Sequence, residues 1–283
     1  KYKDMKSTAQ CLPCLGRLLR QAAELATEDP GLRAQAIEEG LRLVDREFST
    51  DKTSIELAVP LHRLVKAITG NPDPYRSVKE AEVKMVRELG RAWGREPEGD
   101  LKSCLTFAVR GNSIDFFRDL FTIKAHLAQP VEFTIDHREA LERKLRTARG
   151  ILYLADNTGE VFFDLPLVHR LEGFAPVIYV VKESPIQNDV TLADLEKLGL
   201  DKELPRVITT GTDTPGVLMD MASPQFKAEF EAADLVLAKG MGYWETLSEL
   251  PASGKVFHLL KAKCQPVADS LGVALDSYVA LLR

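Results

Sequence analysis

The spacing of apolar residues divides the chain at about residue 150. Before that point, apolar side chains recur three and four positions apart, which is the spacing of one face of an α-helix. The first such stretch has its apolar positions at Leu15, Leu18, Leu19, Ala22, Ala23 and Leu25. Turn and cap residues, such as the Pro-rich segment 70–74, separate it from later stretches of the same kind. We therefore predict a helical domain over residues 5–149.

After residue 150 the pattern changes to short apolar runs that alternate with helical stretches. The runs predict strands at residues 151–154, 177–181, 206–209, 235–238 and 255–259. Helical stretches are expected at residues 164–170, 192–198, 226–232, 244–250 and 262–271. Strands that alternate with helices indicate βαβ units and a parallel sheet. We predict a Rossmann-like α/β domain over residues 150–283.

Composition and charge narrow the class of protein. The chain has 283 residues, of which 45% are hydrophobic and 28% charged, as in an ordinary soluble globular protein. Its net charge of −5 gives no electrostatic footprint for nucleic acid or an anionic membrane. No apolar run approaches the roughly 18 residues of a membrane helix, and no signal peptide opens the chain. We expect a cytoplasmic protein with neither nucleic acid nor membrane as a partner.

The main candidate chemistry lies where the predicted strands end. Asp156 and Asn157 directly follow the first strand, and Asp189 lies in the loop after the second. Open α/β sheets place their ligands just beyond the carboxyl ends of the strands. Carboxylate and amide oxygens suit Mg²⁺ or Mn²⁺ better than a metal that prefers thiolates. Our leading hypothesis is a divalent metal site formed by Asp156, Asn157 and Asp189.

The same loops carry candidates for binding an anion. A helix that starts after residues 156–160 would direct its N-terminus at the site, where a phosphate is favoured. Lys239 ends the fourth strand and is a candidate counter-charge for that phosphate. The candidate substrate-binding residues in these loops are Thr158, Gly159, Asp213, Lys239 and Gly240. A metal, an anion cradle and a lysine together favour phosphoryl transfer to water.

Other catalytic motifs are missing. The sequence has no G-x-G-x-x-G after the first strand, no P-loop and no G-x-S-x-G nucleophile elbow. The D-x-D-x-[TV] run of haloacid-dehalogenase phosphatases is also missing, and the five histidines show no ligand spacing. Cys11 and Cys14 form a CxxC pair at a predicted helix start, with Cys264 far along the chain. They are either partly buried thiols or a zinc, redox or iron centre.

Seven segments resemble a family of known proteins, the metal-dependent damage-control phosphatases, also called domain of unknown function eighty-nine. The segments are residues 11–14 (CLPC) with Arg17, 110–115 (RGNSID), 156–160 (DNTGE), 182–191 (KESPIQNDVT), 211–216 (GTDTPG), 239–242 (KGMG) and 261–268 (KAKCQPVA). The resemblance covers essentially the whole chain, and the CxxC is similar to that of the prokaryotic branch. Tyr243 departs from the family pattern, because a phenol stands where we expect an asparagine amide.

The resemblance implies a helical domain packed on a Rossmann-like α/β/α sandwich with a mainly parallel sheet. It implies that Asp156, Asn157 and Asp189 hold Mn²⁺, Mg²⁺, Co²⁺ or Ni²⁺. It also places Asn112 and Lys239 beside the phosphate, with Ser113 next to Asn112 in the 110–115 segment and a backbone amide from Gly240. Because Asn112 comes from the helical half, we expect the cleft between the two halves.

We conclude from the sequence that the chain is a metal-dependent phosphomonoester hydrolase. Its expected substrate is a small phosphate ester, such as a sugar phosphate or a phosphopantetheine-like compound, with Glu160 or Asp213 as the acid or base. One alternative is a non-catalytic nucleotide or metabolite sensor on the same sheet. Another is a thiol or metal protein centred on the CxxC.

Overall fold

The structure, a computed structural model, describes residues 2, 5–93 and 99–283. Within those residues it has twelve α-helices, one short 3₁₀ helix and one seven-stranded sheet. The helices are α1 (Cys11–Ala26), α2 (Pro30–Glu47), α3 (Ser54–Thr69), α4 (Arg76–Trp93), α5 (Leu101–Gly111), α6 (Leu120–Ala128), α7 (Arg138–Leu145), η1 (Thr158–Glu160), α8 (Val161–Glu172), α9 (Leu192–Leu198), α10 (Pro224–Ala232), α11 (Met241–Leu247) and α12 (Gln265–Leu271). The strands are β1 (Phe133–Asp136), β2 (Ile151–Leu154), β3 (Val177–Val181), β4 (Arg206–Thr209), β5 (Leu235–Lys239), β6 (Val256–Lys261) and β7 (Tyr278–Leu282).

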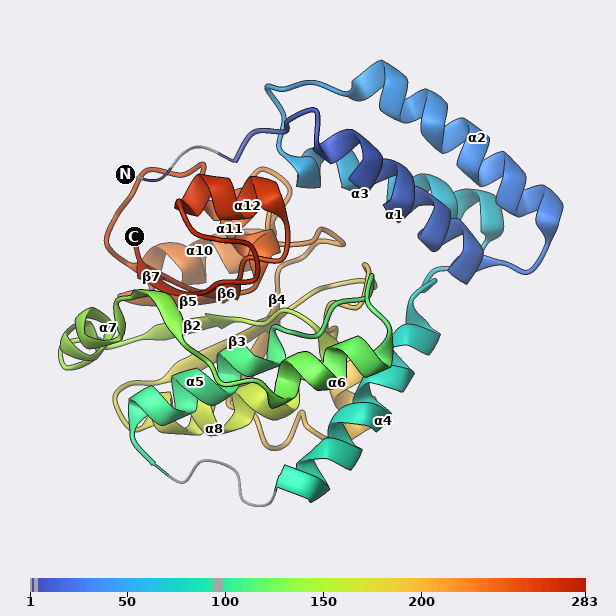
Figure 1. The fold of residues 1–283 in the computed structure, drawn as a ribbon. Coiled ribbons are helices and arrows are strands. Elements are labelled where there is room, and N and C mark those ends of the chain that lie inside the picture. The colour runs from blue at the N-terminus through green and yellow to red at the C-terminus, as the bar shows by residue number, and fades with distance from the viewer. Residues whose placement is uncertain (1, 3–4, 94–98) are drawn as a thin grey trace.

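Helices α1, α2 and α3 form a lobe beside the sheet (Figure 1). Local signals fix where its helices begin. Asp29 accepts hydrogen bonds from two backbone N–H groups at the start of α2, where Pro30 takes the first helical position. Thr53 and Glu56 form a capping box at the start of α3. The apolar faces of the three helices then pack together in small buried clusters.

The sheet has the strand order β1-β7-β6-β5-β2-β3-β4. Strands β6, β5, β2, β3 and β4 are parallel, whereas β7 is antiparallel to β6 and β1 runs parallel to β7. Helices α5 and α8 cover one face, and α10, α11 and α12 cover the other (Figure 1). Alternate residues of β2 therefore enter different cores, as Tyr153 does on one face and Leu152 on the other. This burial on both faces explains the continuous apolar runs, and the predicted α/β fold is confirmed.

Two strands were not predicted. β1 lies inside the half predicted to be helical. β7 is the last strand of the chain and lies between β1 and β6 in the sheet. The side chains of β1 alternate between half-buried and exposed, so its four residues carry little apolar signal of their own. Its place at the sheet edge comes from pairing with β7, which is distant in sequence. Helix α5 also packs on α8 of the sandwich, so the sandwich extends to residues before the predicted boundary at 150. No helix in the described ranges is long and apolar enough to span a membrane.

The α5–α8 contact gives a stability prediction. Phe163 on α8 is 1% exposed and its ring lies 5.1 Å from that of Phe107. Replacing it with Ala should lower the free energy of unfolding by about 3–5 kcal/mol, because a large ring leaves a close-packed core. Phe121, which is 83% exposed, is the matched control, and Phe121→Ala should change stability by less than about 0.5 kcal/mol. Urea unfolding followed by circular dichroism measures both; equal effects would contradict this packing.

Candidate active site

The loops after β2 and β3 are joined by backbone hydrogen bonds. The Val190 N–H donates to Asp156 O at 2.9 Å, and the Thr158 N–H donates to Asn188 O at 2.8 Å. Between these two bonds, Asn157 and Asp189 form an isolated antiparallel bridge. Neighbouring parallel strands deliver the two loops to the same edge of the sheet. The structure thus brings together the three residues predicted to hold a metal.

Side-chain amides orient the carboxylates at this edge. Asn112 Nδ2 donates to Asp156 Oδ2 and to Glu160 Oε1, both at 3.0 Å. Asn157 Nδ2 donates to the same two oxygens, at 3.3 Å and 2.6 Å. Asn112 is the C-cap residue of α5, and its own Oδ1 accepts from the Lys261 backbone N–H at 2.8 Å. Asn112 was expected to extend from the helical half to the site, and in the structure it contacts Asp156 there.

The site carries more negative charge than its surroundings favour. Burial raises the pKa of Asp156 well above its usual value, and the charges of Glu160 and Asp189 raise it further. Burial also raises the pKa of Asp189 to about 6, although Lys182 opposes the shift. Asp189 Oδ2 lies 3.5 Å from Lys182 Nζ and has no hydrogen-bond partner in the described part of the protein. A cation beside both carboxylates would relieve this charge, so the donor set fits a hard divalent metal.

The donor set has only two acidic members. Among residues 2, 5–93 and 99–283, no group of three or more His, Cys, Asp or Glu side chains is placed to hold a metal ion. A metal between Asp156 and Asp189 would therefore rely on the Asn157 amide oxygen and on water or substrate for its other ligands. That arrangement suits Mg²⁺ and similar ions, which keep several waters and take one or two carboxylates.

Gly240 packs its backbone directly against the Asp156 carboxylate. The residue has a φ of +83° at the turn between β5 and α11. A Cβ at this position would lie 1.9 Å from Asp156 Oδ2. Only glycine permits both this backbone conformation and this approach. The sequence predicted Gly240 near the site, and the structure places it there.

Lys239 was predicted to be the counter-charge for a bound phosphate, but in the structure its amine is paired with two buried carboxylates. Its amine is fully buried and donates to Glu160 Oε2 at 2.9 Å and to Asp164 Oδ1 at 2.7 Å. These two carboxylates raise the pKa of Lys239 despite its burial. Glu160 in turn receives bonds on both oxygens, so it holds the amides and Lys239 instead of presenting an acid or base to a ligand. Neither Lys239 nor Glu160 lines the cavity described below, so the structure does not bring them to the ligand side expected for them.

Four other predicted substrate-binding residues make their contacts outside the cavity described next. Ser113 Oγ is 2.8 Å from the hydroxyl of Tyr278. Thr158 Oγ1 donates to the backbone carbonyl of residue 188 at 3.1 Å, and Gly159 packs under α4. Asp213 binds Arg63 and lies 3.7 Å from Lys66, both on α3. None of these four residues lines that cavity, although Thr158 adjoins the Asp156–Asp189 edge.

A cavity of about 680 Å³ lies between the helical lobe and the strand ends, where the cleft was expected. Asp156, Asn157 and Asp189 line one end of it. The α1 and α3 side is mostly apolar and is formed by Leu15, Leu18, Ile55 and Ala58. Four cationic side chains also line the cavity: Lys6, Arg17, Arg118 and Lys263. The Lys263 amine donates to Ile114 O at 2.9 Å, and Arg17 stacks over Phe117. Neither was predicted to contact substrate, although both lie in segments of the family resemblance.

The three cysteines of the CxxC and the 261–268 segment share the wall of this cavity. Cys11 is buried, Cys14 exposed and Cys264 partly exposed, and all three are free thiols. Burial raises the pKa of Cys14, and it raises the pKa of Cys264 to about 12. The thiols of Cys14 and Cys264 are therefore protonated at neutral pH and poor nucleophiles.

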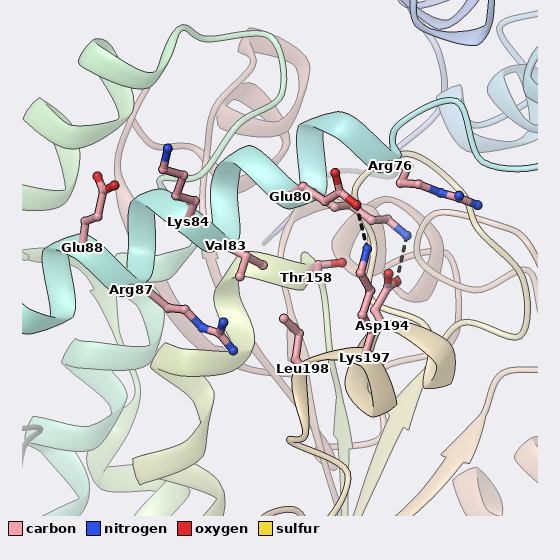
Figure 2. Close-up of a pocket in the computed structure, with 11 residues that line it drawn as sticks. Arg76, Glu80, Val83, Lys84, Arg87, Glu88, Thr158, Asp194, Lys197 and Leu198 are labelled. Atoms are coloured by element: carbon pink, nitrogen blue, oxygen red, sulfur yellow. Dashed lines mark hydrogen bonds and ion pairs between the residues drawn. The ribbon is translucent and has the colours of Figure 1, made fainter.

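A second groove lies behind the site, between α4 and α9 (Figure 2). Its volume is about 510 Å³, and Thr158 lies at its inner side. Two ion pairs cross it, from Lys79 to Asp194 at 2.8 Å and from Lys197 to Glu80 at 2.6 Å. Because Thr158 directly follows Asn157, this groove adjoins the loop that carries Asp156 and Asn157.

Residues 7–279 match one family model, which is described as the damage-control phosphatase ARMT1-like domain. The chain belongs to this family. A damage-control phosphatase of Pyrococcus horikoshii is 33% identical over 98% of both chains, and one of Archaeoglobus fulgidus is 30% identical over 98% of this chain and 99% of its own. An uncharacterised protein of Methanocaldococcus jannaschii is 32% identical over 99% of this chain and 97% of its own.

A solved structure agrees with this assignment. The crystal structure of a DUF89 family protein from Pyrococcus horikoshii superposes with a TM-score of 0.88 at 32% identity, over 98% of this chain and 99% of that one. The predicted family resemblance is confirmed, and membership supports a phosphatase role.

Gly240 provides a test of the site geometry in this family member. Gly240→Ala should cost about 1–3 kcal/mol of stability through its backbone conformation and should also displace the Asp156 carboxylate. Gly254 is the control, because its φ is +70° but no atom lies within 4 Å of an added Cβ. Gly254→Ala should cost about 1–2 kcal/mol and leave hydrolysis of p-nitrophenyl phosphate intact. If both variants keep full activity, the close approach of Gly240 to Asp156 does not matter for the site.

Proposed function

We propose that this chain is a metal-dependent phosphatase that hydrolyses a small phosphorylated metabolite. The observation that carries the proposal is the pair of buried carboxylates, Asp156 and Asp189, which line one end of a 680 Å³ cavity beside Asn157. Membership of the damage-control phosphatase family supports the reaction class. The charge imbalance at these carboxylates supports the requirement for a cation.

Asp156, Asn157 and Asp189 would hold the metal, with Mn²⁺, Mg²⁺, Co²⁺ or Ni²⁺ as the candidate ions. When bound, such an ion supplies a Lewis acid that polarises a phosphoryl oxygen and lowers the pKa of water. The chain's own residues prepare the position. Asn112 and Asn157 fix the rotation of the Asp156 carboxylate through their amide nitrogens, and Lys182 balances part of the charge of Asp189.

The cavity also has groups suited to the substrate. Lys263 and Arg17 bring positive charge to its wall, which favours a phosphate dianion at the carboxylate-and-metal end. Lys263 already lowers the pKa of Asp156 by its charge, so it acts on the same end of the cavity. The apolar side formed by α1 and α3 is suited to the organic part of the ester. A sugar phosphate or a phosphopantetheine-like compound is the substrate class that we propose.

Substitution of either carboxylate should abolish metal-stimulated hydrolysis. We expect Asp156→Ala and Asp189→Ala each to lower Mn²⁺-dependent release of phosphate by about 100-fold or more, because losing even an outer partner of a metal ligand typically costs 10- to 100-fold. Glu172 provides the control, because it is the exposed last residue of α8 and does not line the cavity, so Glu172→Ala removes a carboxylate outside the site. Phosphate release from p-nitrophenyl phosphate and a panel of phosphorylated metabolites measures the effect, with an EDTA-treated sample beside each.

Two outcomes would contradict the proposal in different ways. Full turnover by the Asp156→Ala protein, or turnover that survives EDTA, would show that hydrolysis does not depend on a metal at this site. Ligand-induced thermal stabilisation without any turnover would instead favour the sensor alternative.

A further inference from the structure

Asn188 joins the two loops that carry the predicted metal ligands. Its backbone carbonyl accepts from Thr158 twice, from the N–H at 2.8 Å and from Oγ1 at 3.1 Å. Thr158 directly follows Asn157, and Asn188 directly precedes Asp189. A shift of Asn188 would therefore displace both Asp189 and, through Thr158, Asn157.

The side chain of Asn188 is held by a buried acid from a distant helix. Its Nδ2 donates to Glu82 of α4, at 2.9 Å from Oε1 and 3.1 Å from Oε2. Glu82 is 1% exposed and Asn188 is fully buried, so water cannot replace this bond. An added Cβ on Gly159 would lie 3.3 Å from Glu82 Cβ, so the same residue also packs against η1.

The position of Glu82 on α4 makes this contact unusual. Glu82 lies on the same helix face as Val78, Met85, Val86 and Leu89, which otherwise form an apolar stripe. Burying an acid in such a stripe is costly unless it has a specific partner. Glu82 lies outside all seven segments that carry the family resemblance.

We propose that Glu82 is a positioning residue for the metal site, acting through Asn188 on Asp189 and Asn157. The inference rests on the proposed function, because it concerns the same metal. Glu82 does not touch the metal position. Its bond to Asn188 fixes the spacing of the two ligand loops, as outer-shell partners fix metal ligands elsewhere.

Binding of Mn²⁺ to the metal-free protein tests this role without any substrate. We expect Glu82→Ala to weaken Mn²⁺ binding by about 10- to 100-fold, measured from the free-Mn²⁺ signal in electron paramagnetic resonance titrations. Glu82→Gln should bind Mn²⁺ nearly as the unaltered protein does, because its amide oxygen still accepts from Asn188. Its amide nitrogen can also donate to Asn188 Oδ1, which has no hydrogen-bond partner in the described residues.

Glu80 provides the matched control on the same helix. It is exposed and pairs with Lys197 in the groove behind the site, so Glu80→Ala should leave Mn²⁺ binding unchanged. Asn188→Ala removes the other partner and should weaken binding as much as Glu82→Ala does. The double variant should be no weaker than either single one, because both remove the same contact.

The outcomes separate this inference from the proposed function. Failure of the unaltered protein to bind Mn²⁺ would overturn both the metal site and the role of Glu82. Tight binding by a folded Glu82→Ala protein, or by folded Asn188→Ala if the first variant does not fold, would overturn the positioning role alone. A loss in Glu82→Ala that Glu82→Gln does not restore would also contradict it, since the retained hydrogen bond would then be irrelevant.

Discussion

The structure depends on keeping several carboxylates buried together at the ends of two parallel strands. Asp156, Glu160 and Asp164 come from one short stretch of chain, and Asp189 joins them from the next loop. Buried charges of one sign are unfavourable unless cations and amides meet them. Lys239 contacts both Glu160 and Asp164, at 2.9 and 2.7 Å, whereas Lys182 lies 3.5 Å from Asp189. The lysine contacts are thus closer on the sheet side than on the cavity side, which is where a metal would lie.

The parts of the fold that local patterns encode were predicted well. β2, β3 and β4 begin and end where the apolar runs do, because central parallel strands are buried on both faces. The loops after β2 and β3 were predicted to meet because neighbouring parallel strands end at one edge. β1 could not be found in this way. Its alternating, half-exposed residues take their conformation from β7, about 140 residues later in the chain.

The direction in which each polar side chain points was predicted less well. Lys239 was assigned to phosphate because it ends a strand, but the last residue of a strand can face inward as easily as outward. Its amine is paired with Glu160 and Asp164. The cationic side chains that line the cavity include Arg17 and Lys263 instead. Glu82 did leave a signal, an acid within an apolar helical stripe, but its partner Asn188 is 106 positions away. Pairings over that separation follow from tertiary packing and not from spacing in the sequence.

Contacts from α3, from α4 and from the first residue of the loop itself hold consecutive residues of the loop after β3. His62 of α3 lies 3.0 Å from the amide of Gln187, Glu82 of α4 holds Asn188, and Lys182 meets Asp189. Burial lowers the pKa of His62 to about 3, so its neutral ring can accept from Gln187, whose φ of +46° is rare for a residue with a side chain. The helical lobe therefore does more than cover the cavity. Through α3 it supports the same loop that presents Asp189, so the substrate-facing wall and the carboxylate end of the cavity form one connected structure.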